Sequence, residues 1–257
     1  MIVGSDQVWR WKMIGFNYFF DFIDSSVTDI KKYSYAASFG LSEWNDTDEN
    51  TARIKQLLHQ FNCISVRENT AVEICKNVFN VKAQVVLDPT LLHESKFYEQ
   101  VLLANFNNKP SGKVVSYILG TPHKHLVKEV SIWAKQMGLK HNNLLYTSID
   151  IPLQTKLANL PLMHYTPQEW LNEIRNAEYV ITNSFHATVF SIIFKKKFVV
   201  INNPQGGNDR IDTLLSMVNT TKVYNITPFN EYTFRQVIDV SGLNKMQTES
   251  IRFLENL

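Results

Sequence analysis

The chain has 257 residues, of which 44% are hydrophobic and 19% are charged, and this suits one large or two ordinary globular domains. Its formal net charge is +2 and it has no long run of Lys or Arg, so the composition excludes the basic footprint of a nucleic-acid-binding protein. No apolar run reaches the roughly 18–20 residues of a transmembrane helix, and the N-terminus lacks a secretory signal pattern, so we expect a cytoplasmic protein.

Strand and helix patterns alternate through the first hundred residues. A short strand at residues 2–3 is broken by Gly4, Ser5 and Asp6. The predicted elements are strands at 2–3, 32–37, 63–66 and 83–89, and helices at 48–62, 69–79 and 94–104. A free-standing doubly wound domain usually carries about five or six strands, so we expect the front portion of this domain to be missing.

The alternation restarts after the polar segment at residues 105–113, which contains Pro110 and Gly112 and is the predicted linker. The later predicted elements are strands at 113–119, 142–148, 179–182, 197–202 and 221–226, and helices at 126–137, 167–177, 186–194, 209–218, 231–240 and 243–254. The whole pattern predicts an α/β fold with parallel sheets in two domains, at residues 1–108 and 109–257, the second closing with C-terminal helices. A ligand is expected in the cleft between them, outside the carboxyl ends of the strands.

Polar and cationic residues follow the predicted strands in both halves. They are Ser5, Asp6, Gln7, Arg67, Asp88, Asn183, Ser184, His186 and Arg210. A helix N-terminus stabilises a phosphate or carboxylate, and forked guanidinium groups match the oxygens of such anions. His186 begins an apolar helix, where it could donate to an anion or transfer a proton near neutral pH. These residue types therefore indicate a site for a small anion.

Several of these residues also have a purely structural interpretation. Ser184 can be a helix N-cap, Arg67 and Glu68 can form a solvated pair at a helix start, and Asp88 can form a turn. The aromatic stretch at residues 8–23 can be a carbohydrate platform, although core packing is the more frequent role of such a stretch. The two cysteines, Cys63 and Cys75, have no redox or zinc spacing, and we expect both in the core of a protein from a reducing compartment. We expect no metal site.

The motifs, taken together, resemble the polysaccharide pyruvyl transferase family. The matching stretches are IVGSDQVW, KKYSYAASFG, ISVRENTA, VVLDPTLL, YTPQEWLNEIRNAEYVITNSFHATVFSIIFKKKFVVI and NDRIDTLL. They follow the order of the family and run from Ile2 to about Leu215. The resemblance implies two Rossmann-like domains of the GT-B glycosyltransferase type. Family chains normally begin with a further βαβ portion, in agreement with the strands that we expect to be missing.

The resemblance also implies a chemistry. Such a protein is a transferase of cell-surface polysaccharide biosynthesis that moves a pyruvyl group from phosphoenolpyruvate to two sugar hydroxyls and forms a cyclic ketal, with no cofactor. His186 and Arg67 match the histidine and an arginine of the family, so we predict them as catalytic. The predicted substrate-binding residues are Ser5, Asp6, Gln7, Asn183, Ser184 and Arg210. Ser184 stands where well-studied members have an arginine, so Arg210, Lys195 or another group would have to compensate, or the donor would be another small anion.

Two other functions fit the same pattern. The two-domain architecture also permits a nucleotide-sugar-dependent glycosyltransferase, and a short first domain permits a non-catalytic, truncated interaction subunit. The expected partners of the transferase are a small anionic donor and a sugar or lipid-linked oligosaccharide acceptor. A lipid-linked acceptor would place the protein at the inner membrane surface, and an exposed sheet edge would favour a homo-oligomer. Each expectation for the enzyme depends on Arg67 and His186 acting on one anion.

Overall fold

A computed structural model of the chain describes residues 1–27, 29–119, 124–144, 165–203, 206–220, 234 and 238–257. The chain forms two compact units. Unit 1 consists of Met1–Leu92, Pro204–Thr220 and Asp239–Leu257, and unit 2 consists of His93–Asn203 and Thr221–Ile238. The chain therefore returns to unit 1 twice after leaving it. The domain boundary between residues 108 and 109 stays a prediction.

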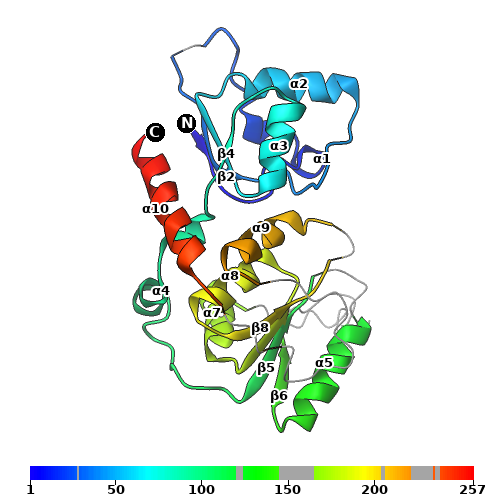
Figure 1. Cartoon of the computed structure of the whole chain (residues 1–257), viewed down its shortest axis with the longest axis vertical. Helices are drawn as coiled ribbons and strands as arrows, with labels where there is room; N and C mark the ends of the chain where they lie inside the picture. The colour runs from blue at the N-terminus through cyan, green and yellow to red at the C-terminus, as the bar shows by residue number, and fades with distance from the viewer. Residues whose placement is uncertain (28, 120–123, 145–164, 204–205, 221–233, 235–237) are drawn as a thin grey trace, which may run out of the picture. The chain divides into compact units, whose positions relative to one another are not determined.

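Unit 1 is built on a parallel sheet of four strands in the order β1-β2-β3-β4. The strands are Ile2–Val3 (β1), Tyr33–Ala37 (β2), Cys63–Val66 (β3) and Gln84–Val85 (β4). Their order in the sheet follows their order in the chain, and crossovers between parallel strands are almost always right-handed. The connecting helices must then lie on one face of the sheet. These helices are α1 (Trp11–Ile14), α2 (Asp48–Leu58) and α3 (Asn69–Asn77), and Figure 1 shows α3 in front of the strands.

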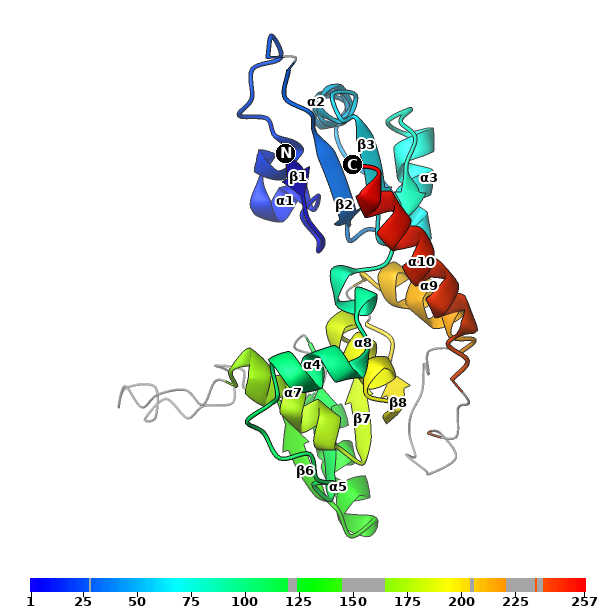
Figure 2. The ribbon, with the colours of Figure 1, turned by 90° about the vertical axis from the view of Figure 1, so that its left-hand side faces the viewer.

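The alternation of side chains along β3 separates the two faces of this sheet. Ile64 and Val66 belong to a large core with residues of α2 and α3, together with the aromatic side chains of Trp9 and Phe19. The other face packs on α10 (Ser241–Glu255), the last helix of the chain, through Tyr35, Val86 and Phe253. In Figure 2, α10 runs beside α9 (Asp209–Met217), which it contacts. Two late segments of the chain therefore complete unit 1.

Unit 2 is built on a second four-stranded parallel sheet, in the order β6-β5-β7-β8. The strands are Lys113–Tyr117 (β5), Lys140–Asn143 (β6), Tyr179–Thr182 (β7) and Lys197–Val200 (β8). The helices are α4 (Ser95–Val101), α5 (Lys124–Gln136), α7 (Pro167–Asn176) and α8 (Phe185–Ile193). The chain moves to one side from β5 to β6 and to the other side from β7 to β8, so the order reverses between β5 and β7. Ligands of open α/β sheets bind outside such a point.

The predicted α/β class with parallel sheets is confirmed, with local differences. The last strand of unit 1 has two residues, Gln84–Val85, because the chain then turns into a short 3-10 helix at Pro89–Leu92. Strand β6 begins two residues before the predicted start, and residues 145–148 lie outside the described residues. The predicted strand at 221–226 also lies outside them, as does most of the predicted helix at 231–240. Core packing of the aromatic stretch is confirmed for Trp9 and Phe19, and of the cysteines only Cys75 is fully buried.

Candidate active site

Arg67 is the centre of a charged cluster in unit 1. It follows β3, is 3% exposed, and donates from Nη1 to Asp88 Oδ2 at 2.9 Å and from Nη2 to Asp6 Oδ1 at 3.2 Å. Because β1, β3 and β4 are parallel, the residues that follow them meet at one edge of the sheet. The structure therefore brings the predicted site residues Asp6 and Arg67 together, and both ends of the Arg67 fork are occupied by carboxylates.

Asp88 is the buried partner of Arg67, with 2% of its surface exposed. Its Oδ2 also accepts a hydrogen bond from Ser5 Oγ at 2.6 Å. Its Oδ1 accepts from the backbone N and from Oγ1 of Thr90, at 3.0 Å and 2.6 Å. The bonds to Thr90 show that Asp88 forms a turn, which confirms the structural interpretation of this residue. The same carboxylate also fixes Arg67 and Ser5, because charge-assisted bonds on both oxygens hold it in one orientation.

Glu68 is a member of this cluster that the sequence analysis missed. It is fully buried, and its Oε1 accepts a hydrogen bond from Ser38 Oγ at 2.8 Å. Burial raises the pKa of Glu68, against the opposing effects of the Ser38 bond and the charge of Arg67. The interpretation of Arg67 and Glu68 as a solvated pair is therefore wrong, because both side chains are buried. The sequence did contain a signal for this buried cluster, because two charged residues directly follow an apolar strand.

Arg210 adds a second guanidinium group to the cluster. It lies in the first turn of α9, and its side chain is half-buried. Burial and the charge of Arg67 lower the pKa of Arg210 to about 10, although Glu68 and Asp6 attract it. The group is therefore still a cation at neutral pH. Among the described residues it has no hydrogen-bond partner, and its Nε and Nη1 atoms are buried.

Asp6 connects the charged cluster to a cavity in unit 1. Its backbone φ is +96°, and a residue other than glycine in such a conformation typically carries strain of about 1–3 kcal/mol. The conformation is held by a bond from Ser38 N to Asp6 O at 2.9 Å, and the carboxylate is 61% exposed. The cavity has a volume of about 600 Å³ and is lined by Gly4, Ser5, Asp6, Gln7, Val8, Met13, Ile14 and Tyr18.

Gln7 is also fixed at this edge. Its Oε1 accepts from Arg10 Nη1 at 3.2 Å, and its side chain lies against Gly40. A Cβ at Gly40 would displace the Gln7 side chain, and the φ of Gly40 is +65°, so this position favours glycine. The predicted residues Ser5, Asp6, Gln7 and Arg67 therefore lie together in unit 1, each with a defined support.

The predicted residues of unit 2 lie at the junction of β7 and α8. Asn183 accepts from Leu119 N at 2.7 Å and donates from Nδ2 to Leu119 O at 3.0 Å. Leu119 follows β5, so Asn183 joins the two strands at the point where the strand order reverses. Ser184 is the N-cap of α8 and accepts from Ala187 N at 3.5 Å, which confirms its structural interpretation.

His186 is the second residue of α8 and is partly exposed. Its neighbours in the helix are almost all buried, so the apolar face of α8 anchors the helix while its first turn carries the imidazole. The centroid of its ring lies 5.4 Å from the centroid of the Phe185 ring, and the two rings meet edge to face. Arg67 belongs to unit 1 and His186 to unit 2, so their action on one anion stays a prediction.

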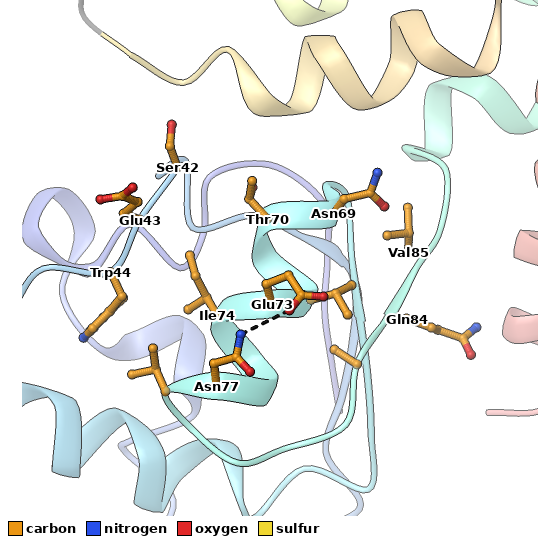
Figure 3. Close-up of a pocket in the computed structure, with 13 residues that line it drawn as sticks. Ser42, Glu43, Trp44, Asn69, Thr70, Glu73, Ile74, Asn77, Gln84 and Val85 are labelled. Atoms are coloured by element: carbon orange, nitrogen blue, oxygen red, sulfur yellow. Dashed lines mark hydrogen bonds between the residues drawn. The ribbon is translucent and has the colours of Figure 1, made fainter.

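A second cavity of unit 1 lies beside α3 and has a volume of about 630 Å³. Figure 3 shows its lining, with Asn77 on α3 donating to Glu73 Oε2 at 3.1 Å. The lining residues are Ser42, Glu43, Trp44, Asn69, Thr70, Val72, Glu73, Ile74, Asn77, Val78, Ala83, Gln84 and Val85. They include two carboxylates and no Lys or Arg, so this cavity repels an anion, in contrast to the arginine cluster.

The sequence matches a known protein family. The model of the polysaccharide pyruvyl transferase family matches residues 1–205. No curated protein matches the chain. In the described part of the chain no helix is long and apolar enough to cross a membrane, and no group of three or more His, Cys, Asp or Glu side chains could hold a metal ion. The matched range includes Arg67 and His186 and ends before Arg210.

Proposed function

Because this chain belongs to the polysaccharide pyruvyl transferase family, a family of transferases, we propose that it moves the pyruvyl group of phosphoenolpyruvate to two hydroxyls of a sugar and forms a cyclic ketal. The observation that carries this proposal is the presence of two guanidinium groups, Arg67 and Arg210, at one edge of the unit 1 sheet. Phosphoenolpyruvate has a phosphate and a carboxylate, and guanidinium groups suit the oxygens of both.

The proposed reaction moves two protons. Protonation of the methylene carbon of phosphoenolpyruvate makes its C2 a cation-like centre, which the first sugar hydroxyl attacks. Phosphate leaves, and the second hydroxyl closes the ketal ring at the same carbon. The two hydroxyls release two protons, of which one balances the proton gained by the methylene carbon and the other leaves with phosphate. The protein must therefore hold an anion and transfer protons close to it.

His186 is the group that we assign to proton transfer. An imidazole can give and take a proton near neutral pH, and a positioned general acid or base accelerates a reaction by about 10²–10⁴-fold. The first turn of α8 also carries the partial positive charge of a helix N-terminus, which favours an anion. Asn183 and Ser184 support this turn through their bonds to Leu119 and Ala187, and their role in binding substrate stays a proposal.

The acceptor sugar is assigned to the cavity beside Asp6. Its lining combines polar side chains, Ser5, Asp6 and Gln7, with the partly exposed ring of Tyr18. Sugars bind through such a combination, in which hydroxyls meet carboxylate and amide oxygens while a ring face packs on an aromatic side chain. The exposed carboxylate of Asp6 would accept a hydrogen bond from an acceptor hydroxyl.

Several finer features belong to the same proposal. We assign the two parallel sheets to two Rossmann-like domains of the GT-B type, which is supported by the reversal of strand order in unit 2. A lipid-linked oligosaccharide acceptor would place the protein in the cytoplasm at the inner membrane surface. The edge strand β1 would allow a homo-oligomer to form.

The proposal is tested by incubating the protein with phosphoenolpyruvate and a broad panel of sugar and lipid-linked acceptors. We expect release of inorganic phosphate and an acceptor mass increased by one pyruvyl ketal. Nucleotide diphosphate-sugars serve as the competing donors. Transfer from one of these, with no phosphate release from phosphoenolpyruvate on any acceptor, would show that the chain is a glycosyltransferase instead.

A further inference from the structure

Arg210 is a cation for which the described part of the fold provides no hydrogen-bond partner. A guanidinium group has five N–H donors, and those of Arg210 donate to no described residue. Its Nε and Nη1 atoms are also buried. Buried donors in proteins almost always have partners, so this group requires an explanation.

The neighbouring charges do not explain it. Both ends of the Arg67 fork are directed at Asp6 and Asp88, and Glu68 Oε1 accepts from Ser38. Glu68 Oε2 has no partner among the described residues, although Arg210 lies close enough for the two charges to interact. Burial and the charge of Arg67 disfavour the cation, whereas the charges of Glu68 and Asp6 favour it without accepting a hydrogen bond from it. An anion beside Arg210 would provide the acceptors that its buried Nε and Nη1 atoms lack.

The loop before α9 approaches the same guanidinium. A Cβ at Gly207 would lie 3.5 Å from Arg210 Nη2, in ordinary contact, so the loop backbone runs beside this nitrogen. The φ of Gly207 is +75°, a conformation that glycine adopts without strain. The side chain of Arg210 is thus placed by α9 and bordered by this loop, although no hydrogen bond to the described residues holds it.

We propose that Arg210 is the residue that directly binds the anionic group of the donor and that Arg67 is a positioning residue that acts through Asp6 and Asp88. The identity of the donor rests on the proposed function, whereas the anion site rests on Arg210 itself. Residue 210 lies outside the matched range 1–205, so the assignment rests on the surroundings of Arg210 and not on the family match.

The proposal is tested by measuring the binding of inorganic phosphate, pyruvate and phosphoenolpyruvate to the full chain by titration calorimetry. The test variant is Arg210→Met, which keeps the length of the side chain but removes its charge. The control is Arg252→Met, which removes an exposed arginine of α10 in the same unit. Loss of a charge-assisted contact should weaken phosphoenolpyruvate binding on the order of 10- to 100-fold in Arg210→Met, with no change in the control. The two smaller anions show whether the phosphate or the carboxylate is bound.

The stability of the same variants without anion separates ligand binding from a structural role. Removal of a buried cation without a partner should leave the melting temperature unchanged or raise it, and the stabilisation of the wild type by phosphate should be lost. A lower melting temperature together with unchanged phosphate binding would overturn the proposal, because Arg210 would then be structural. If phosphate binding depends on Arg210 but phosphoenolpyruvate is never turned over, the anion site stands and the proposed function fails. If turnover occurs and Arg210→Met binds phosphoenolpyruvate as the wild type does, the function stands and this proposal fails.

The roles of the two arginines are separated by steady-state kinetics of Arg210→Lys and Arg67→Lys. Lysine keeps the charge but loses the fork. We expect Arg210→Lys to raise the KM for phosphoenolpyruvate with kcat close to that of the wild type, because its effect is on donor binding. Arg67→Lys should lower kcat with little change in that KM, because it displaces Asp6 and Asp88. The reverse pattern would make Arg67 the donor ligand and overturn the assignment.

Discussion

The carboxyl edges of the two sheets differ in charge. In unit 1 the edge holds Arg67, Asp6 and Asp88 in an ion-pair network, with Glu68 and Arg210 beside it. Among the described residues of unit 2, the edge carries neutral side chains, of which Asn183 fixes the loop after β5 and Ser184 caps α8. In the described part of the chain, one sheet edge therefore carries a charged network, and the other combines neutral side chains with the imidazole of His186.

This difference suits separate tasks for the two units in the proposed reaction. In the proposed reaction the guanidinium group of Arg210 binds a highly charged donor but cannot protonate it, because an arginine keeps its proton at neutral pH. The imidazole of His186 can exchange a proton but adds little to the binding of a double anion. Substitutions in the two units should accordingly affect different measurements.

The largest effect is expected from His186→Ala in unit 2. Loss of a general acid or base should lower kcat by about 10²–10⁴-fold. His186 is partly exposed and lies in the first turn of a helix anchored by other residues, so the unfolding curve should not change. Phosphate release measures the rate, and thermal unfolding is the control. Activity within a few-fold of the wild type would exclude the imidazole from the reaction.

The next largest effect is a loss of unfolding free energy, which we compare for one ion pair in each unit. Asp88→Ala leaves Arg67 buried without its main partner, and breaking a buried pair costs about 3–5 kcal/mol. Glu173→Ala breaks the more exposed pair with Lys113 in unit 2, for which we expect about 1 kcal/mol or less. Urea denaturation measures both. Equal losses of unfolding free energy would show that the ion pair of Arg67 and Asp88 stabilises the protein no more than the pair of Lys113 and Glu173 does.

A smaller effect is expected from His141, a half-buried histidine of unit 2. Its ring bonds to Ser116 Oγ and Ser131 Oγ, and burial lowers the pKa of His141 from 6.5 to about 4. The unfolded chain therefore takes up a proton at a higher pH than the folded chain does. The contribution of His141 is complete above pH 6.5, falls as the pH decreases towards 4, and then levels off.

Because the ring is partly exposed, the loss over this range should be about 1–2 kcal/mol rather than the full value of the shift. The measurement is the free energy of unfolding of the wild type and of His141→Gln between pH 7 and pH 4. The difference between the two proteins should change across this window. A constant difference would contradict the buried neutral ring.

The smallest effect is expected from Ser184→Ala. Loss of a helix N-cap costs about 0.5–2 kcal/mol, and the bond to Ala187 N is long at 3.5 Å, so we expect a value near the lower limit. Ser184→Thr keeps a capping hydroxyl and is the matched control. Thermal unfolding measures both. If Ser184→Ala instead abolished donor binding without loss of stability, Ser184 would be a ligand of the donor rather than a cap.

The sequence predicted the architecture because the periodicity of apolar residues is local. The alternation of strands and helices, the apolar helix after His186 and the cap at Ser184 depend on neighbouring residues only. The gathering of Ser5, Asp6 and Arg67 was also predictable, because parallel strands place their carboxyl ends at one edge. Each of these predictions required a pattern of a few residues.

The remaining features depend on contacts between distant residues. Glu68 reads as a solvated residue because Ser38, its partner, lies 30 positions away. The pairing of Arg67 with Asp88 across 21 positions has no local signal. The association of α9 and α10 with unit 1 depends on close packing, in which a Cβ at Gly242 would lie 2.6 Å from Met217 O. The periodicity of apolar residues in α9 and α10 does not indicate which unit these helices join.

The central claim is that donor binding belongs to the arginine cluster and proton transfer to His186. It is tested most directly by titrating phosphoenolpyruvate into His186→Ala and Arg210→Met under the same conditions. The account predicts that His186→Ala binds the donor with wild-type affinity but does not turn it over, whereas Arg210→Met binds it at least about tenfold more weakly. The account would be contradicted if His186→Ala lost the donor and Arg210→Met kept it.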